Sequence, residues 1–426
     1  MIRLGPRQEA QSAPPRGRWP RAAAVLALAA VVLVLSGCTA EIAQPFSTIA
    51  PQNEKTEDIQ NLYKITFWAS LVVFIGVQVA IGYTALRFRR RNEDRPEQVH
   101  GSRKLEIAWT IIPAVILLVL FIPTAQTIFD HANDADRAAA SDETFRVNVI
   151  GKQWWWEISY PDIPANPDDP EAGPIVTANE VLVPVGANVL FSLASNNVIH
   201  SFWVPQLSGK VDLIPGHDNK MQFVAERPGE YWGECAEFCG ASHAWMRFKV
   251  NVLPREEFDA WVAAWRTPPA FDANAETADV AEAPPAFGAC IACHRVSGTN
   301  AQVAGQGIAQ NPGYVDPATG EPVPGPGPNL TLMGCRDTIG AGILENTPEN
   351  METWLKRTDE VKEGVYMPNY YKQGLTDEQI AELVDYLESL RPADGCPGDD
   401  LLVGSEVAAP VIEAQDPNED PGEDPQ

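Results

Sequence analysis

Histidine and basic residues are scarce in this chain, and each scarcity narrows what the protein can do. Its 426 residues include six histidines, too few for a metal cluster built mainly from imidazole ligands. Lys and Arg number 31 against 57 Asp and Glu, and the formal charge at pH 7 is −26. Nucleic acid needs a basic surface, so we expect no nucleic-acid partner. An acidic surface attracts a basic protein partner, or simply keeps an exported protein soluble.

The length and the uneven composition indicate several domains rather than one. Residues 405–426 carry seven acidic residues and no basic one, and they are rich in proline. We therefore expect 397–426 to form an acidic disordered tail. A second segment, 267–286, is rich in Pro, Ala and acidic residues, and this composition is typical of a linker.

The first apolar run, Ala22–Leu35, follows five arginines and is too short to span a membrane comfortably. It leads into a Leu-Ser-Gly-Cys sequence that resembles a bacterial lipobox and ends at Cys38. We predict a lipoprotein-type signal peptide over 1–37, a lipidated Cys38 and an external N-terminal segment over 38–61. A free, unmodified Cys38 is the alternative.

Two later apolar runs, 62–86 and 106–129, are long enough to cross a membrane. The loop between them carries seven Lys and Arg, whereas the flanks beyond carry mainly acidic residues. By the positive-inside bias the loop is cytoplasmic and both ends of the mature chain lie outside. The sequence therefore predicts a transmembrane helical hairpin over 62–130.

A region of short alternating runs follows, from 143 to 254, with turn signals between the runs. Phe145–Ile150 and Val181–Val185 are examples. Several short strands at such spacing favour a β-sandwich or barrel.

Soft metal ligands gather near the end of this β-rich region. Cys235 and Cys239 are four residues apart, His243 follows four residues later, and Met246 three residues beyond that. Cys, His and a weak Met form the ligand set of electron-transfer copper, and a second Cys allows two sulfurs to bridge two coppers. His200, on an earlier predicted strand, can supply a second imidazole. The alternative is an ordinary disulfide between the two cysteines.

A second cofactor motif lies after the linker. Cys290, Cys293 and His294 have the spacing of c-type haem attachment, in which two thiols bind the vinyl groups and the adjacent His becomes an axial ligand. A zinc site or a redox-active cysteine pair is the alternative. We predict an all-α cytochrome c domain over 287–396.

The sequence downstream of this motif looks like that of class I cytochromes c. Gly-Pro-Asn-Leu at 327–330 looks like their haem-packing turn, and Thr376 opens an amphipathic helix with a capping box. Met367, in Tyr-Met-Pro-Asn, is the predicted second axial ligand. Met333 and Met351 remain competitors, although a buried Met is usually a filler of the core.

Two cysteines, Cys335 and Cys396, are left once copper, haem and lipid are assigned. In an oxidising compartment they can pair, which would close the cytochrome domain near its C-terminal end. Spacing alone does not establish the bond.

The copper-ligand loop, together with Gln-Trp-Trp-Trp at 153–156, resembles the binuclear copper (CuA) domain of cytochrome c oxidase subunit II. The resemblance covers most of the chain and implies a cupredoxin-like β-barrel over 143–254. It implies the following copper ligands: the side chains of His200, Cys235, Cys239, His243 and Met246, and the backbone carbonyl of Glu237. It further implies that the carboxylate of Glu237 helps to bind a magnesium ion against the catalytic subunit.

The resemblance also assigns roles to Trp154 and Glu106. Trp154 is implied to be the point at which electrons enter the copper centre. Three indoles in a row cannot all point inward on a strand, so we expect an exposed indole there, with alternating core and surface aromatics as the alternative. Glu106 matches the family residue at the mouth of the K proton channel, and a snorkelling interfacial charge is its alternative. Asn197 departs from the family, which often has an acidic residue there for docking soluble cytochrome c.

These features predict a multidomain membrane protein with a two-helix transmembrane hairpin, a cupredoxin-like β-barrel and an all-α cytochrome c domain. The resemblance implies subunit II of a respiratory heme–copper oxidase in a bacterial plasma membrane, with copper and haem on the periplasmic side. Electrons would reach the haem c, then the copper pair, then a catalytic subunit that reduces oxygen to water with proton translocation.

The implied partners are subunit I, subunit III and an external donor such as a cytochrome or a quinol–cytochrome reductase complex. Two alternatives remain: a subunit of a copper-containing nitric oxide reductase, and a membrane-tethered electron shuttle without an enzyme partner. Quinol oxidase subunits lack the two copper cysteines, and nitrous oxide reductase needs more histidines than this chain has.

Overall fold

The computed structural model describes most of the chain between residues 46 and 397. The described ranges are 46–89, 101–169, 173–267, 283–291, 293, 294, 296, 310–315, 322–324, 327–392 and 395–397. The predicted signal peptide, Cys38, most of the predicted linker and nearly all of the predicted tail lie outside them.

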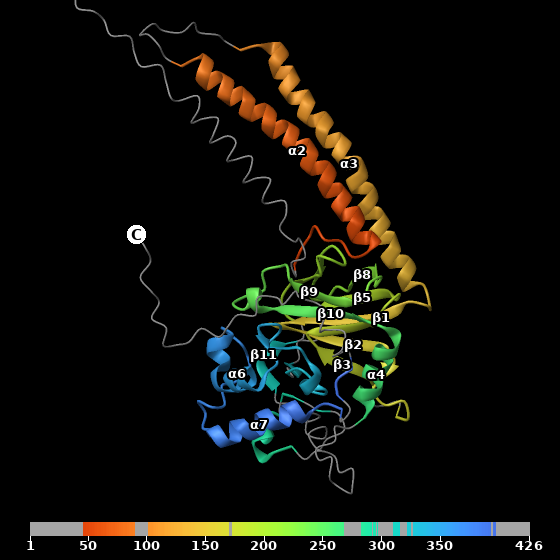
Figure 1. The fold of residues 1–426 in the computed structure, drawn as a ribbon, viewed down its shortest axis with the longest axis vertical. Coiled ribbons are helices and arrows are strands. Elements are labelled where there is room, and N and C mark those ends of the chain that lie inside the picture. Colours follow the sequence, from red (N-terminus) through yellow and green to blue (C-terminus); the bar gives the residue numbers. More distant parts are fainter. Residues whose placement is uncertain are drawn as a thin grey trace, which may run out of the picture. The chain divides into compact units, whose positions relative to one another are not determined.

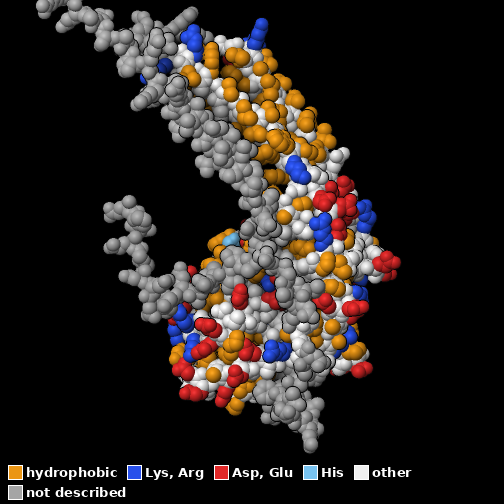
Figure 2. All heavy atoms as spheres, viewed as in Figure 1, with side chains coloured by type: hydrophobic (Ala, Val, Ile, Leu, Met, Phe, Trp, Pro, Cys, Tyr) orange, Lys and Arg blue, Asp and Glu red, His pale blue; other side chains and the backbone are white. Residues whose placement is uncertain are grey.

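Two long helices, α2 (Glu54–Arg87) and α3 (Arg103–Ala139), run beside one another (Figure 1). Their most apolar stretches have mean hydropathies of 2.0 and 2.5, and both helices are long and apolar enough to cross a membrane. Figure 2 shows hydrophobic side chains along their surface. The helices extend past the apolar runs, to Glu54 and to Ala139, since their polar ends pack on the β-rich domain.

The β-rich domain consists of ten strands and one covering helix. These are β1 (Phe145–Lys152), β2 (Trp155–Pro164), β3 (Pro174–Ala178), β4 (Glu180–Pro184), β5 (Asn188–Ser195), β6 (His200–Trp203), β7 (Val211–Leu213), β8 (Asn219–Val224), β9 (Gly229–Cys235), β10 (Arg247–Leu253) and α4 (Arg255–Arg266). One sheet has the order β3-β2-β1-β5-β8 and the other β4-β10-β9-β6-β7. The pairs β1–β5 and β4–β10 are parallel, whereas the remaining pairs in these two sheets are antiparallel.

Aromatic side chains from the two sheets meet in one buried core. Trp156 of β2 packs edge-on against Phe248 of β10 with ring centroids 5.2 Å apart, and Phe202 of β6 stacks on Phe248 at 4.1 Å. The hydroxyl of Tyr160 accepts a hydrogen bond from the N–H of Leu182 at 2.8 Å, which links β2 to β4. Alternation along each strand places these rings inside, and their burial supplies most of the driving force for this fold.

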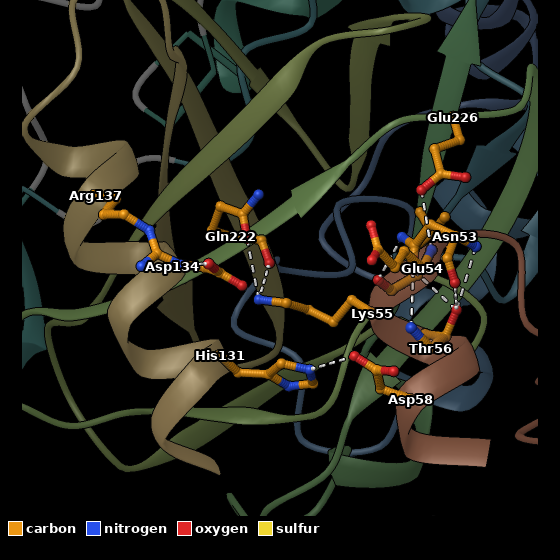
Figure 3. A network of polar contacts seen from close by, with 11 residues as sticks. Asn53, Glu54, Lys55, Thr56, Asp58, His131, Asp134, Arg137, Gln222 and Glu226 are labelled. Atoms are coloured by element: carbon orange, nitrogen blue, oxygen red, sulfur yellow. Dashed lines mark hydrogen bonds and ion pairs between the residues drawn. The ribbon is translucent and has the colours of Figure 1, made fainter. Parts of the chain in front are cut away.

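A polar network ties the helical hairpin to this domain (Figure 3). The ammonium of Lys55 in α2 donates to the backbone carbonyl of Gln222 at 2.7 Å and to its side-chain Oε1 at 3.1 Å. Nε2 of His131 in α3 lies 3.9 Å from Oδ2 of Asp58 in α2. This contact joins the two helices near the ends that pack on the β-rich domain. The end of the hairpin is therefore held against β8.

The C-terminal domain is mainly helical, with a few short strands. Its described elements are η4 (Pro285–Ala289), β11 (Gln310–Val315), β12 (Pro322–Pro324), η5 (Met333–Cys335), β13 (Thr338–Ile339), β14 (Leu344–Glu345), α6 (Pro348–Val361) and α7 (Asp377–Ser389). The predicted capping box at Thr376 is present at the start of α7. Phe287 packs against Tyr386 at 5.0 Å in a second buried core. The predicted three-part layout is confirmed, and two short strand pairs are added to the cytochrome domain.

Candidate functional site

The copper-ligand residues converge between the end of β9 and the start of β10. Cys235 is the last residue of β9, and the loop from 236 to 246 returns the chain to β10 through the short helix η3 (His243–Trp245). The backbone N–H of Cys235 donates to the carbonyl of Met246 at 3.0 Å, which closes the base of the loop. The loop geometry is therefore fixed by the edges of two paired strands.

The two cysteine sulfurs lie 3.8 Å apart and are not joined. A disulfide would need about 2.05 Å, so this arrangement is that of two separate ligands. Each sulfur has its own imidazole: Cys235 Sγ lies 3.8 Å from His200 Nδ1, and Cys239 Sγ lies 3.7 Å from His243 Nδ1. This near-symmetric pair of Cys–His sets fits two metal ions that share both sulfurs.

Two weaker donors complete the site. Met246 Sδ lies 3.9 Å from Cys239 Sγ, and the carbonyl oxygen of Glu237 lies 3.3 Å from Cys235 Sγ. A thioether among thiolates and imidazoles suits copper rather than zinc, whose protein ligands are Cys, His and carboxylates. The residues present therefore fit the copper centre that the sequence predicts. The side chain of Glu237 is exposed, whereas the two sulfurs are buried.

The two cysteine sulfurs compete for one proton. The hydrogen bond between them lowers the pKa of Cys235, with further help from His200, and raises the pKa of Cys239. Burial opposes the charge on Cys235 but does not outweigh these bonds. One thiolate is thus available to a cation, which would displace the remaining proton.

Alternation holds in the Trp triplet, but the partly exposed indole is Trp155, while Trp154 and Trp156 are buried. Only 6% of the surface of Trp154 is accessible, and Trp156 is fully buried in the core. Trp154 is covered because Tyr366 of the cytochrome domain stacks on it. Its indole Nε1 donates to the carbonyl of Cys239 at 3.1 Å, so the ring sits directly against the copper loop.

The haem-attachment residues form a tight turn at the start of the cytochrome domain. The backbone N–H groups of Cys293 and His294 both donate to the carbonyl of Cys290, at 3.0 and 2.9 Å. His294 Nδ1 lies 2.8 Å from the carbonyl oxygen of Pro328, which keeps the proton on Nδ1 and leaves Nε2 free for iron. Burial lowers the pKa of His294, so the ring is neutral and able to bind a metal.

A cavity of about 470 Å³ opens beside this turn. It is lined by Cys290, Cys293, His294 and all three methionines considered as axial ligands, Met333, Met351 and Met367. Met333 and Met351 belong to the buried core, whereas Met367 only packs against it from a loop. A haem fits the chemistry of this largely apolar cavity, because both cysteines and a neutral imidazole face one space.

The remaining predicted residues lie elsewhere. Cys335 and Cys396 are joined by a disulfide with an S–S distance of 2.00 Å and a Cα–Cα distance of 5.3 Å. Glu106 is exposed in the first turn of α3. Sequence reasoning missed Lys362 and Tyr366, which contact Trp154. The aromatic beside Met367 was a weak signal for Tyr366, but nothing in the acidic run around Lys362 distinguished that lysine.

Comparison with known proteins gives consistent matches along the chain. Residues 47–126 match the family model for the transmembrane domain of cytochrome c oxidase subunit II, 145–253 match that for its periplasmic domain, and 280–391 match cytochrome c. Cytochrome c oxidase subunit 2 of Alkalihalophilus pseudofirmus is 32% identical over 88% of this chain and 98% of its own length. The protein of the same name from Bacillus sp. is 36% identical over 85% of this chain and 95% of its own length.

Solved structures give partial matches. The periplasmic domain of subunit II of cytochrome oxidase from Bradyrhizobium japonicum is 32% identical, covering 29% of this chain and 94% of that chain, with a TM-score of 0.25.

Proposed function

Because the chain belongs to the cytochrome c oxidase subunit II family and carries a cytochrome c domain, we propose that it relays electrons from a covalent haem c to a binuclear copper centre. The observation that carries this proposal is the position of Trp154. Its ring lines the haem cavity, and its Nε1 donates to the carbonyl of the copper-loop residue Cys239 at 3.1 Å. One side chain therefore borders both sites.

The copper site would be held by the buried cluster described above. Its proposed ligands are the side chains of His200, Cys235, Cys239, His243 and Met246, and the backbone carbonyl of Glu237. Bound copper would supply a one-electron centre shared between two metals. The strand edges on either side of the loop hold the ligands in place, and little ligand movement is then needed when the charge changes.

In the cytochrome domain, Cys290 and Cys293 would carry the haem and His294 would bind its iron. We propose Met367 as the second axial ligand, because it reaches the cavity from a loop while Met333 and Met351 belong to the packed core. A Met/His pair raises the haem potential, which suits donation to an acceptor near the oxygen end of a respiratory chain.

The chain is a membrane-anchored subunit, and as subunit II of a heme–copper oxidase it has subunit I as its partner. We further propose that subunit III and an external donor belong to the system, and that the copper and haem domains face the periplasm. Three residue roles are proposals of the same kind: Glu106 at the entrance of a proton channel, Glu237 as a magnesium ligand at the subunit interface, and Cys38 as a lipid attachment site.

Purification of the whole membrane complex tests this function. We expect the optical spectrum to contain a c-type haem and the near-infrared band of a mixed-valence copper pair, and we expect the complex to consume oxygen. The copper loop could also serve a nitric oxide reductase, so the same preparation is assayed with nitric oxide. Nitric oxide consumption without oxygen uptake would refute the oxidase. Both metal centres without either activity would favour a tethered shuttle.

A further inference from the structure

Lys362, just after α6, is buried at the contact between the cytochrome and copper domains. Only 2% of its surface is exposed. Its ammonium donates to three backbone carbonyls: Trp154 at 2.7 Å, Gly340 at 2.8 Å and Trp245 at 2.9 Å. Two of these carbonyls belong to the copper domain and one to the cytochrome domain. All three protons of the ammonium are used, which offsets part of the cost of burying the charge. Burial nevertheless lowers the pKa of Lys362 to about 7.

Two of these carbonyls lie next to functional elements. The carbonyl of Trp154 belongs to the residue that borders both sites, and the carbonyl of Trp245 immediately precedes the proposed copper ligand Met246. Close by, the hydroxyl of Ser242 in the copper loop donates to the carbonyl of Glu363. The lysine therefore fixes the cytochrome domain to the backbone of the copper loop itself.

Tyr366 follows four residues later and immediately precedes Met367. Its ring lies almost parallel to that of Trp154, with an angle of 6° and centroids 5.7 Å apart. Its hydroxyl donates to Gln153 Oε1 at 3.2 Å, and Gln153 Nε2 in turn donates to the carbonyl of Cys239 at 2.7 Å. An offset stack of two aromatic rings thus joins the proposed haem-ligand loop to the copper loop.

Gly364 allows this close approach. Its φ of +75° lies in the left-handed region, and a Cβ at this position would lie 3.2 Å from both Ala241 Cβ and Trp154 Cη2. A larger residue would push the Lys362–Met367 segment away from the copper domain.

We propose that Lys362 is a positioning residue for the internal electron transfer, because it seats the Lys362–Met367 segment on the copper domain and keeps the Tyr366 ring on Trp154. This inference rests on the function proposed above. The step moves one electron from the reduced haem to the oxidised copper pair, and no bond is made or broken. Since electron tunnelling weakens steeply with distance, a domain held at a fixed separation transfers electrons faster than one that swings on a linker.

The first test is Lys362→Met in the intact oxidase complex. The haem is reduced by a flash-generated reductant, and the oxidation of haem and reduction of copper are followed optically. We expect the rate of electron transfer from haem to copper to fall roughly tenfold or more. Loss of a hydrogen bond to a charged donor shifts the docking equilibrium between the two domains by about a factor of ten. The haem potential and the copper EPR signal should not change. The matched control is Lys372→Met, which removes an exposed ammonium paired with Asp359 and Glu360.

A second pair of variants leaves the charge in place. Gly364→Ala places a methyl group against Trp154 and should lower the internal rate. Gly374→Ala carries at least as much backbone strain, with φ of +116°, but its methyl group enters open space, so it should leave the rate unchanged. If Lys362→Met does not assemble, this pair decides the question.

The outcomes are separable. An unchanged rate in an assembled Lys362→Met complex would overturn the inference, and so would equal rates in the two glycine variants. Absence of internal transfer in the wild-type complex would instead refute the proposed relay.

Discussion

The carboxylate of Glu180 in β4 accepts a hydrogen bond from the backbone N–H of Asp337 in the cytochrome domain, at 3.1 Å. The N–H of Thr338 donates to the same oxygen at 3.2 Å. Nearby, Lys249 donates to Asp337 Oδ2 and to Glu230 Oε2, both at 3.1 Å. This buried polar cluster is a second point of attachment between the two domains, separate from Lys362.

This contact predicts a pH dependence. Burial, with the nearby charge of Asp337, raises the pKa of Glu180 to about 8 from an ordinary value of 4.5. The folded, docked state therefore binds a proton more tightly than the unfolded state, and its stability decreases as the pH rises from 4.5 to about 8. Each unit of difference in pKa is worth about 1.4 kcal/mol.

We expect the thermal unfolding midpoint of the purified complex to fall over this pH range, and Glu180→Gln to make the fall shallower. The control Glu382→Gln changes an exposed carboxylate in α7 and should keep the wild-type slope. A Glu180→Gln complex with the wild-type slope would show that another group is responsible.

Cys235→Ser should abolish the near-infrared absorption and the multi-line EPR signal of a mixed-valence copper pair, because only one bridging sulfur remains. The haem spectrum should be unchanged, since its cavity is lined by other cysteines. Replacing both Cys335 and Cys396 by Ser is the cysteine control and should preserve the copper signals. Retention of two coppers with the same spectrum in Cys235→Ser would contradict the bridging assignment.

Met367→His should leave the haem attached through Cys290 and Cys293 but lower its reduction potential and remove the thioether-to-iron charge-transfer band. An imidazole stabilises oxidised iron more than a thioether does, so the direction is downward. Redox titration and the optical spectrum measure both effects. Met351→Leu is the control and should change neither; if it removes the band instead, Met351 is the axial ligand.

Glu106→Ala should slow steady-state oxygen reduction while an external donor still reduces haem and copper quickly. The reason is that this residue is proposed to serve proton uptake, on the membrane side opposite to the metals. Stopped-flow reduction and an oxygen electrode give the two rates on one preparation. Glu57→Ala, an exposed carboxylate in the first turn of α2, is the matched control. Normal turnover in Glu106→Ala would leave proton uptake to the partner subunit.

The sequence was sufficient for the ligand loop because most of its donors lie between Cys235 and Met246, and their spacing alone carries the chemistry. The helical hairpin could also be predicted from the sequence, since the length of an apolar run decides whether it can cross a membrane. The start of α2 was placed too late and the end of α3 too early. The polar turns at these two ends pack against the β-rich domain, and hydropathy does not report that contact.

The contacts between the copper and cytochrome domains could not be predicted from the sequence, for a different reason. Lys362 and Trp154 are 208 residues apart, and their bond joins an ammonium to a backbone carbonyl. No periodicity or motif marks such a pair. For the same reason the covering of Trp154 by Tyr366 could not be foreseen from alternation within one strand.

The partners of Lys362 have a consequence for evolution and engineering. Because they are main-chain carbonyls, the acceptors of Lys362 do not themselves depend on side-chain identity. Separate constraints still act on Trp154, whose ring stacks on Tyr366, and on Gly340, whose φ is +67°. Insertions or deletions in the segments around Trp154, Trp245 and Gly340 would displace the acceptor carbonyls, whereas single substitutions would leave the carbonyls in the chain. Chimaeras that place this haem domain on a foreign copper domain should therefore be chosen by matching loop lengths, with sequence identity a secondary guide.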